Sequence, residues 1–551
     1  MRCCFRIAVA SCALALSLVP ALSRAQAPQI SLPSGELSSV LEQGARLESE
    51  RRWSDALTYY EEAAKNHPER AELQERLLTA RAHYDVDRRY SDASYTTALQ
   101  TLTARQSVDT YDEILQKIFT HHFKQPEWDR MFQRGVLFLQ AGLDDPHFLT
   151  KNARNATPEQ IAAFRQELPR LAATFRVTDR LSARDAAAAV AKAAADRLGV
   201  PSTATLMEFA CASAASLDEY SGFLTGSQVD EVFSQIEGNF VGLGVELKAD
   251  NGTLLIVNTI AGGPADQGGL KGGDRITAVN GKTCQEVTTD VAADMLRGEE
   301  GSTVNVTIVS AVGSTRTYKL TRRRVEVPSV EDVKIIDRAG GVGYFKLTSF
   351  QKTTNRDVDA ALWKLHAEGM RSLVIDLRGN PGGLLRAAVD VADKFVNEGL
   401  IVATRGRSPR EDFDHRGQTP GTWRVPLVVL IDKDSASASE ILAGAIRDHK
   451  RGQLIGEKSY GKGSVQGIFP LTGSNAGIRL TTAQWYTPSG QAISGQGIVP
   501  DTVVRKAGKP VVETGRTPAE GQDTILQAGI DAARTVTAKR PTTVSSAMLK
   551  N

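Results

Sequence analysis

The 551-residue chain is poor in cysteine and has no excess of charge of either sign. Five cysteines are present, but three of them lie within the first twelve residues, which leaves Cys211 and Cys284 for the rest of the chain. Two cysteines cannot form a disulfide framework. We expect two isolated buried thiols, and a single disulfide between them is the alternative. The 66 lysines and arginines are balanced by 64 aspartates and glutamates, so the composition argues against nucleic acid as a partner.

Metal-ligand motifs and long apolar runs are also missing. The 8 histidines include no His-Glu-x-x-His run or similar spacing, so no metal and no organic cofactor is expected. After the amino-terminal segment no run approaches the ~18 apolar residues that a membrane span needs, so no span is expected in the mature chain.

The amino terminus has the pattern of a secretory signal. Arg2 and Arg6 precede an apolar stretch over residues 7–22, and Ala25–Ala27 supplies a small-residue cleavage site. The sequence therefore predicts a signal peptide over residues 1–27 and an exported protein, periplasmic or extracellular.

Two runs farther along suggest a nucleophile and its base. Ser435–Ile441 is small and polar, then apolar at helical spacing, which predicts a helix that begins at a serine. Gly461–Gln466 places a lysine between glycines, ahead of a predicted strand. A serine hydroxyl needs a base, and a lysine can serve only when neutral. Burial lowers a lysine's pKa by up to ~3–5 units, so a buried Ser–Lys pair is chemically sound.

Each run also has a simpler interpretation. Ser437-x-x-Glu440 is a capping box, which satisfies N–H groups at a helix start. The run ending at Lys462 approaches a phosphate-binding loop, but Gly463 stands where a serine or threonine is required. A serine–histidine pair fails because His449 lies about 18 Å farther along the same helix, where we expect it at the carboxyl end.

Both runs and their separation resemble those of the carboxyl-terminal processing peptidases, which are serine proteases with a Ser–Lys dyad. In that family the nucleophile is the middle serine of an S-A-S-A-S-E-like run, and the lysine follows 25 positions later, as Lys462 follows Ser437. The resemblance implies catalytic roles for Ser437, Lys462 and Gln466.

An oxyanion hole needs backbone donors near the nucleophile. The N–H of Ala438, at the start of the predicted helix, is well placed. The resemblance implies a second donor from the glycine-rich turn that ends Asp376–Gly383. Either Gly382 or Gly383 fits, and we favour Gly383.

A second resemblance, to bacterial PDZ domains, covers residues 238–326. There a loop of successive backbone N–H groups binds a peptide's terminal carboxylate, and the next strand accepts the peptide by strand addition. The peptide-binding residues implied by the resemblance are Val241, Gly242, Leu243, Gly244 and Val245.

The amino-terminal region has the pattern of helical repeats. Five small, aromatic and proline residues fit one tetratricopeptide-like unit over residues 36–68: Gly44, Ala56, Tyr60, Ala63 and Pro68. Helices are expected near 37–50 and 53–66, and they must stack on later helices of the chain because a lone repeat leaves a face exposed. An ordinary helical hairpin is the alternative. By analogy, an adaptor protein is a candidate partner for this region.

The segment Leu217–Thr225 resembles the family's L-D-P-Y-S sequence, with Glu219 in place of the usual proline. We interpret that departure as one that bears on a turn and not on chemistry.

The predicted fold class is multidomain, with an α-helical amino-terminal region, a PDZ domain (small, β-rich α+β) and an α/β protease core. The expected ranges are 1–27 for the signal peptide, 28–152 for the helical region, 153–237 for a helical protease segment, 238–326 for the PDZ domain, 327–505 for the protease core, and 506–551 for a tail with a short helix near 523–534.

The function predicted from the sequence is an exported, PDZ-regulated serine endopeptidase. It would recognise the free C-termini of proteins or peptides and hydrolyse peptide bonds through an acyl-enzyme on Ser437, with Lys462 as general base. The alternative is a non-catalytic tetratricopeptide and PDZ adaptor that scaffolds partner proteins. No oligomeric state is predicted.

Overall fold

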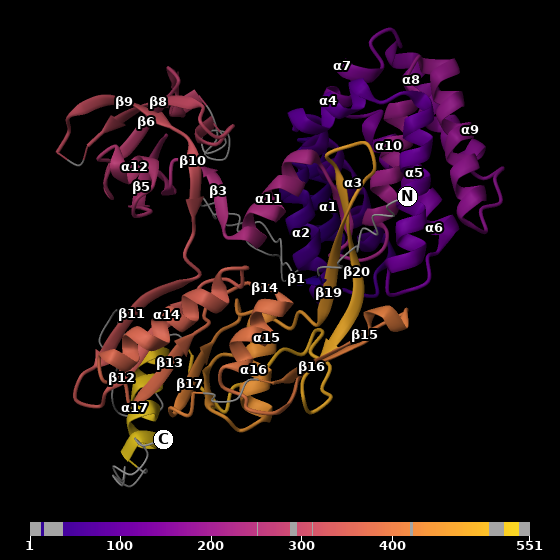
Figure 1. The fold of residues 1–551 in the computed structure, drawn as a ribbon. Coiled ribbons are helices and arrows are strands. Elements are labelled where there is room, and N and C mark those ends of the chain that lie inside the picture. Colours follow the sequence, from indigo (N-terminus) through magenta and orange to yellow (C-terminus); the bar gives the residue numbers. More distant parts are fainter. Residues whose placement is uncertain are drawn as a thin grey trace, which may run out of the picture.

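A computed structural model describes residues 13–15, 37–250, 252–286, 295–310, 312–418, 423–505 and 523–538. Most of the predicted signal peptide and most of the predicted tail lie outside these ranges. Figure 1 shows three parts: a helical region, a small β-rich domain and a larger α/β core. The multidomain fold class predicted from the sequence is confirmed.

Among the described residues, the amino-terminal part is built from ten helices. Their bounds are α1 Leu37–Ser49, α2 Trp53–Asn66, α3 Ala71–Ser91, α4 Ala93–Thr101, α5 Ala104–His121, α6 Trp128–Gly142, α7 Pro146–Asn152, α8 Pro158–Ala172, α9 Arg180–Leu198 and α10 Ser202–Ala215. Helices α4 to α10 and the end of α3 surround one core that contains Phe132, Phe138 and Phe209, while α1, α2 and the start of α3 share a smaller core.

The hairpin of α1 and α2 follows the bounds expected from the repeat pattern. Gly44 in α1 lies against the ring of Tyr60 in α2, and a Cβ built on Gly44 would lie 2.3 Å from that ring. The small and aromatic positions of the pattern are therefore partners in one helix–helix contact. This contact explains why the spacing of Gly44 and Tyr60 in the sequence predicts a pair of packed helices.

The small β-rich domain, which the sequence predicts to be a PDZ domain, is a sheet with strand order β4-β5-β6-β8-β9, so that β4 is an edge strand. The bounds are β4 Val245–Asp250, β5 Thr253–Thr259, β6 Arg275–Val279, β8 Thr303–Val309 and β9 Thr315–Thr321, with β7 Lys282–Thr283 beside β6 and helix α12 Pro264–Gln267. A two-stranded antiparallel ribbon, β3 Asn239–Gly242 with β10 Arg323–Glu326, joins this sheet to the rest of the chain, next to helix α11 Gly226–Glu237.

The α/β core contains a mixed sheet of order β11-β12-β13-β17-β18-β21, in which neighbours from β12 onward are parallel. The bounds are β11 Val330–Asp337, β12 Val342–Leu347, β13 Ser372–Asp376, β17 Leu427–Ile431, β18 Gln453–Gly456 and β21 Thr502–Val503. Helices α14 Thr354–Ala367, α15 Leu385–Asp393 and α16 Ala438–Asp448 pack on one face, and α17 Thr524–Ala538 packs on the other. Helix α17 lies where the short tail helix was expected.

A second sheet connects the core to the helical region. Its order is β14-β1-β19-β20-β15-β16, and β2 pairs with β20. The bounds are β1 Ala13–Ala15, β2 Gly222–Leu224, β14 Gly383–Leu384, β15 Gly399–Gly406, β16 Phe413–Gly417, β19 Ser464–Pro470 and β20 Gly477–Tyr486. The hairpin of β19 and β20 rises between the helices (Figure 1), and its Leu471, Ile478 and Leu480 are buried in the helical core.

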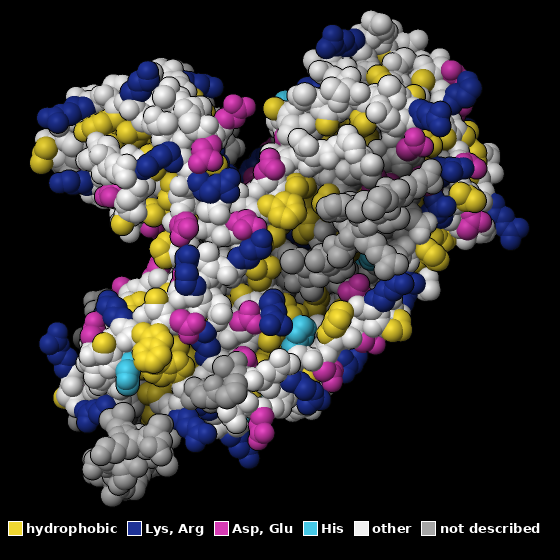
Figure 2. Space-filling view, viewed as in Figure 1, with side chains coloured by type: hydrophobic (Ala, Val, Ile, Leu, Met, Phe, Trp, Pro, Cys, Tyr) yellow, Lys and Arg dark blue, Asp and Glu magenta, His cyan; other side chains and the backbone are white. Residues whose placement is uncertain are grey.

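The surface view agrees with the balanced composition. In Figure 2 the PDZ domain and the helical region form two lobes above the protease core, and basic and acidic side chains are interspersed over the visible face. Of the helices among the described residues, none combines the length and apolar character that crossing a bilayer requires.

Candidate active site

Ser437 lies at the start of α16, directly after the turn that follows β17. Its backbone has φ +56° and ψ −113°, a conformation that residues other than glycine rarely adopt and that stores strain. The side chain is fully buried. A strained serine at the strand-to-helix turn is a geometry that fits a nucleophile, because strain persists only where surrounding contacts enforce it.

The two neighbouring serines of the run are anchored elsewhere. Ser435 Oγ donates to the carbonyl of Leu377 at 2.9 Å, and Ser439 Oγ donates to the carbonyl of Asn380 at 3.0 Å. Both bonds fix the start of α16 to the glycine-rich turn after β13. Ser435 and Ser439 thus support the start of α16, and the role of Ser437 as nucleophile stays a prediction.

Glu440 binds both catalytic runs at once. Its Oε2 accepts from the backbone N–H of Ser437 at 2.8 Å and from that of Lys462 at 2.9 Å. Its Oε1 accepts from the N–H of Gly461 at 2.7 Å and from the hydroxyl of Ser459. Two N–H groups that share one acceptor oxygen lie side by side, so this carboxylate places the serine and lysine runs next to each other.

A capping box was predicted from the sequence. Its hydrogen bond from the backbone N–H of Ser437 to the carboxylate of Glu440 is present. The capping and the catalytic interpretations are compatible, because the cap is what holds the nucleophile's backbone. Burial raises the pKa of Glu440, against the opposing effect of its four donors.

Lys462 is 1% exposed, and its pKa is lowered to about 7. Burial is the larger cause and the positive charge of Arg479 the next. A large fraction of its amine is therefore neutral near pH 7, as a general base requires.

The glycines beside Lys462 are required by close backbone contacts. A Cβ on Gly461, which has φ +97°, would lie 2.9 Å from the backbone N of Gly497, and one on Gly463 would lie 2.5 Å from that of Ser494. Trp485 Nε1 donates to the Lys462 carbonyl at 2.9 Å. The lysine is thus set on a rigid entry to β19.

Gln466 lies in β19 and is fully buried. Its Nε2 donates to Ser464 Oγ at 2.9 Å, and among the described residues its Oε1 has no hydrogen-bond partner. A buried amide oxygen without a partner is costly, and it is available to a donor that arrives with substrate or with a moving lysine amine.

The glycine-rich turn contacts Ser437 directly. A Cβ on Gly382 would lie 2.8 Å from Ser437 Cβ and 3.0 Å from Ala438 N. The N–H of Gly382 donates to Asn380 Oδ1 at 2.8 Å, and Gly383 stays the predicted second donor. Among the described residues the N–H of Ala438 has no acceptor.

A short extended segment crosses this site. Strand β1 pairs antiparallel with β14, with Ala15 opposite Gly383, and antiparallel with β19, with Leu14 opposite Gln466. The two strand edges therefore form a slot one strand wide beside the candidate catalytic residues.

Comparison with known proteins identifies the family. A model of peptidase family S41 matches residues 341–504, and a PDZ domain model matches residues 255–310. The carboxy-terminal-processing protease of Bartonella bacilliformis is 40% identical over 299 residues, which are 53% of this chain and 67% of that protein. The chain belongs to the family of carboxy-terminal-processing proteases.

Two further relatives extend the comparison. The carboxyl-terminal-processing protease of Synechocystis sp. is 39% identical over 269 residues, 48% of this chain and 62% of that protein. A solved photosystem II D1 C-terminal processing protease covers 73% of this chain and 94% of its own, at 24% identity and a TM-score of 0.38. Against the first two relatives, the chain spans about two thirds or less of their length.

The predicted peptide-binding loop of this carboxy-terminal-processing protease family member lies between strands β3 and β4. Val241 and Gly242 belong to β3, and Val245 begins the edge strand β4. Between them, the N–H groups of Leu243 and Gly244 have no acceptor among the described residues, and Gly244 has φ +73°. Successive unpaired N–H groups next to an open strand edge suit a terminal carboxylate.

Sequence reasoning missed three residues at the site of this family member. Glu440 was assigned to a helix cap only, although its place in the S-x-x-E run was the available signal. Tyr220 covers the lysine, with its ring centroid 4.7 Å from Lys462 Nζ. Arg479, from β20, lowers the lysine's pKa. No sequence signal linked either residue to Lys462, because both contacts join distant segments.

One interpretation of the sequence is wrong. Glu219 was expected to affect a turn and no chemistry, but its negative charge is one of those that raise the pKa of Lys462. His449 follows expectation, since it caps the carboxyl end of α16 and bonds to the Leu400 carbonyl.

Proposed function

We propose that this protein is an exported serine endopeptidase in which Ser437 is the nucleophile and Lys462 the general base. The observation that carries the proposal is the shared carboxylate of Glu440, which holds the backbones of both residues side by side in a buried site. The lowered pKa of Lys462, about 7, supplies the neutral amine that the chemistry needs.

The reaction proceeds in two halves. Ser437 Oγ attacks the substrate carbonyl carbon as its proton passes to the Lys462 amine, and the resulting oxyanion accepts hydrogen bonds from the N–H groups of Ala438 and Gly383. The Lys462 ammonium then gives its proton to the departing amine, which leaves an acyl-enzyme. A water molecule, deprotonated by Lys462, hydrolyses that ester and restores the serine. In this scheme Gln466 orients the lysine amine through its unpaired Oε1.

The slot between β14 and β19 supports an extended substrate. In the register of β1, the backbone approaches Gly383 as residue numbers rise, so the residues before the scissile bond would pair with both strands. Backbone pairing on two sides recognises an unfolded chain with little dependence on its side chains. Removal of the signal peptide on export would leave this slot open to substrate.

The PDZ domain gives the proposed protease its selectivity for chain ends. A free carboxylate would bind the N–H groups of Leu243 and Gly244, and the residues before it would add to the edge of β4. The helical region, with its tetratricopeptide-like hairpin, is then the part available to an adaptor protein.

The test is digestion of a denatured model protein that ends in small apolar residues, with fragments read by mass spectrometry. Wild type and Lys458→Ala, an exposed lysine in the same loop, should both produce fragments. Ser437→Ala and Lys462→Ala should reduce the cleavage rate by at least about 1,000-fold, as removal of a dyad member does elsewhere. Equal cleavage by Ser437→Ala would refute the mechanism, and binding of the model protein with no cleavage by wild type would favour the adaptor alternative.

A further inference from the structure

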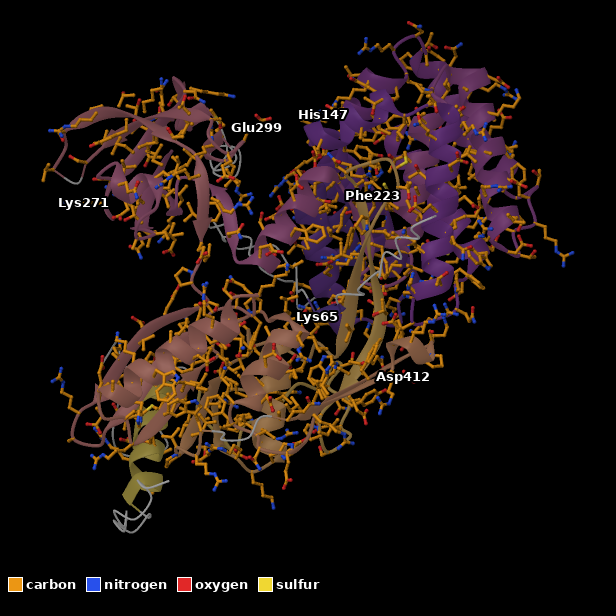
Figure 3. The ribbon with its side chains drawn as sticks, viewed as in Figure 1. Lys65, His147, Phe223, Lys271, Glu299 and Asp412 are labelled. Carbon is orange, nitrogen blue, oxygen red and sulfur yellow. The ribbon has the colours of Figure 1, made fainter. Side chains whose placement is uncertain are left out.

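The segment that leads from the helical region to the PDZ domain covers the catalytic lysine. Residues 218–221 pass over the base, and the ring centroid of Tyr220 lies 4.7 Å from Lys462 Nζ. Immediately afterwards β2 pairs with β20, and Phe223 of β2 packs among the helices beside Tyr95, as Figure 3 shows for Phe223. The cover is therefore fixed to β20 and to the helical region.

Asp218 fastens this cover. Its Oδ1 accepts from the Tyr220 N–H at 2.8 Å and from Thr481 Oγ1 at 2.9 Å, and its Oδ2 lies 3.0 Å from His122 Nε2. Burial opposes the charged carboxylate, but the hydrogen bonds from His122, Ser221 and other groups outweigh it and hold the pKa of Asp218 below its usual value. A charged, fully bonded anchor keeps the Tyr220 ring over the amine.

Arg479 brings a second positive charge to the same place. Its Nε donates to the Tyr220 carbonyl at 2.7 Å, and its backbone pairs with Gly222 of β2. Arg479 is therefore held by the same segment that covers the lysine. A neighbouring cation disfavours the ammonium form of a lysine and so activates it as a base.

We propose that Tyr220 and Arg479 are positioning residues for the base: the ring shields the Lys462 amine from water, and the guanidinium places a like charge beside it. This inference rests on the proposed function, since it concerns the same lysine. It makes the segment from the helical region a part of the active site.

The charged and titratable groups that act on Lys462 come from several elements. Arg479 of β20 favours the neutral amine, while Glu219 and Asp218 of the covering segment and Glu440 of α16 favour the ammonium form. Tyr220 contributes its ring face, which attracts an ammonium, and its bulk, which excludes water. The balance leaves the pKa of Lys462 at about 7, with burial as the largest cause.

The experiment measures kcat/KM against pH with one peptide substrate. Activity should rise as Lys462 loses its proton, so the wild-type profile should rise through pH about 7. Arg479→Gln removes the like charge and should raise the pKa, which lowers kcat/KM at pH 7 by roughly fivefold and restores it at higher pH. Arg479→Lys should keep the wild-type profile.

Substitutions at two further positions distinguish a change in the pKa of Lys462 from a general loss of activity. Glu219→Gln removes an opposing charge, so the rise of its profile should move to lower pH, opposite to that of Arg479→Gln. Tyr220→Ala should move the rise to higher pH, while Tyr220→Phe keeps the ring and should match wild type. Arg316→Gln, an exposed arginine on the PDZ domain, is the control expected to leave the profile unchanged.

A second readout does not depend on peptidase activity. In a Ser437→Ala background, competitive acetylation with acetic anhydride across a pH series, followed by mass spectrometry of the Lys462 peptide, reports the neutral fraction of the amine. Arg479→Gln should shift this labelling curve to higher pH and Glu219→Gln to lower pH. These shifts without any peptidase activity would uphold the positioning role while the proposed function fails.

Coincident labelling curves for wild type, Arg479→Gln and Glu219→Gln, in variants with unchanged thermal midpoints, would overturn the inference. A loss of kcat/KM by the same factor at every pH would also overturn it, because a merely structural role moves the height of the profile and not its position.

Discussion

At the scale of single residues, the candidate site depends on one buried carboxylate. Glu440 is 1% exposed and accepts four hydrogen bonds, two of them from the backbones of Ser437 and Lys462. The strained φ of Ser437 needs such a partner, since a serine held at positive φ costs of order 1–3 kcal/mol by itself. Glu440 therefore acts by fixing two backbones.

Replacing that carboxylate by an amide tests its role. In Glu440→Gln the NH₂ group faces two N–H or O–H donors, and each donor left unsatisfied costs about 1–3 kcal/mol. We expect a loss of about 2–5 kcal/mol in unfolding free energy, measured in urea, and a fall in kcat/KM of at least about 100-fold. Glu368→Gln, at an exposed helix end, is the matched control. Wild-type stability and activity in Glu440→Gln would show that the shared acceptor is dispensable.

At the scale of elements, helices and strands can be predicted from the sequence where the buried residues are close together in the chain and regularly spaced. The strands β12, β13 and β17 are short and mostly apolar runs, a pattern that indicates strands buried on both faces of a sheet. The Gly44 and Tyr60 spacing predicted α1 and α2, because both residues belong to one hairpin contact. The spacing of Ser437 and Lys462 predicted their partnership by resemblance to a family.

Contacts between distant elements were not predictable in the same way. Tyr220 lies just before β2 and Arg479 lies in β20, and no local pattern connects these segments, since β2 and β20 meet only in the folded chain. The cover over the base thus depends on tertiary pairing. Local periodicity in the sequence does not predict the pairing of β2 with β20.

The PDZ groove gives a prediction at this scale. A fluorescent peptide with a free carboxylate should bind the Ser437→Ala protein at least about tenfold more tightly than the same peptide ending in an amide, because the amide loses the charge that the N–H nest stabilises. Gly244→Ala should weaken binding as well, since φ +73° is strained for alanine and the new Cβ would lie 3.2 Å from Val325. Equal affinity of carboxylate and amide, measured by fluorescence anisotropy, would rule out recognition of a free C-terminus by this loop.

At the scale of the whole molecule, the helical region and the PDZ domain each contact the protease core, through different segments. The helical region contacts β19, the strand that begins just after Lys462, and its neighbour β20, because the β19–β20 hairpin packs in the helical core. In addition, the N–H of Phe123 donates to the Thr481 carbonyl of β20 at 3.0 Å. The PDZ domain is joined to the core by the β3–β10 ribbon. Where the ribbon meets the core, the N–H of Val327 donates to the Gly238 carbonyl and the N–H of Lys352 donates to the Ile236 carbonyl. A bound C-terminus and the catalytic site are thus linked by short, continuous structure.

The most direct test of the Ser–Lys mechanism is to trap the covalent intermediate. Wild-type protein, mixed with an activated ester of a short peptide and quenched in acid within the first turnover, is digested and its serine-containing peptides are weighed by mass spectrometry. We expect one acyl group on Ser437, absent from Ser437→Ala and from Lys462→Ala. Acylation of Ser435 or Ser439 instead, or turnover without any acyl-enzyme in a protein that cleaves peptides, would contradict the mechanism.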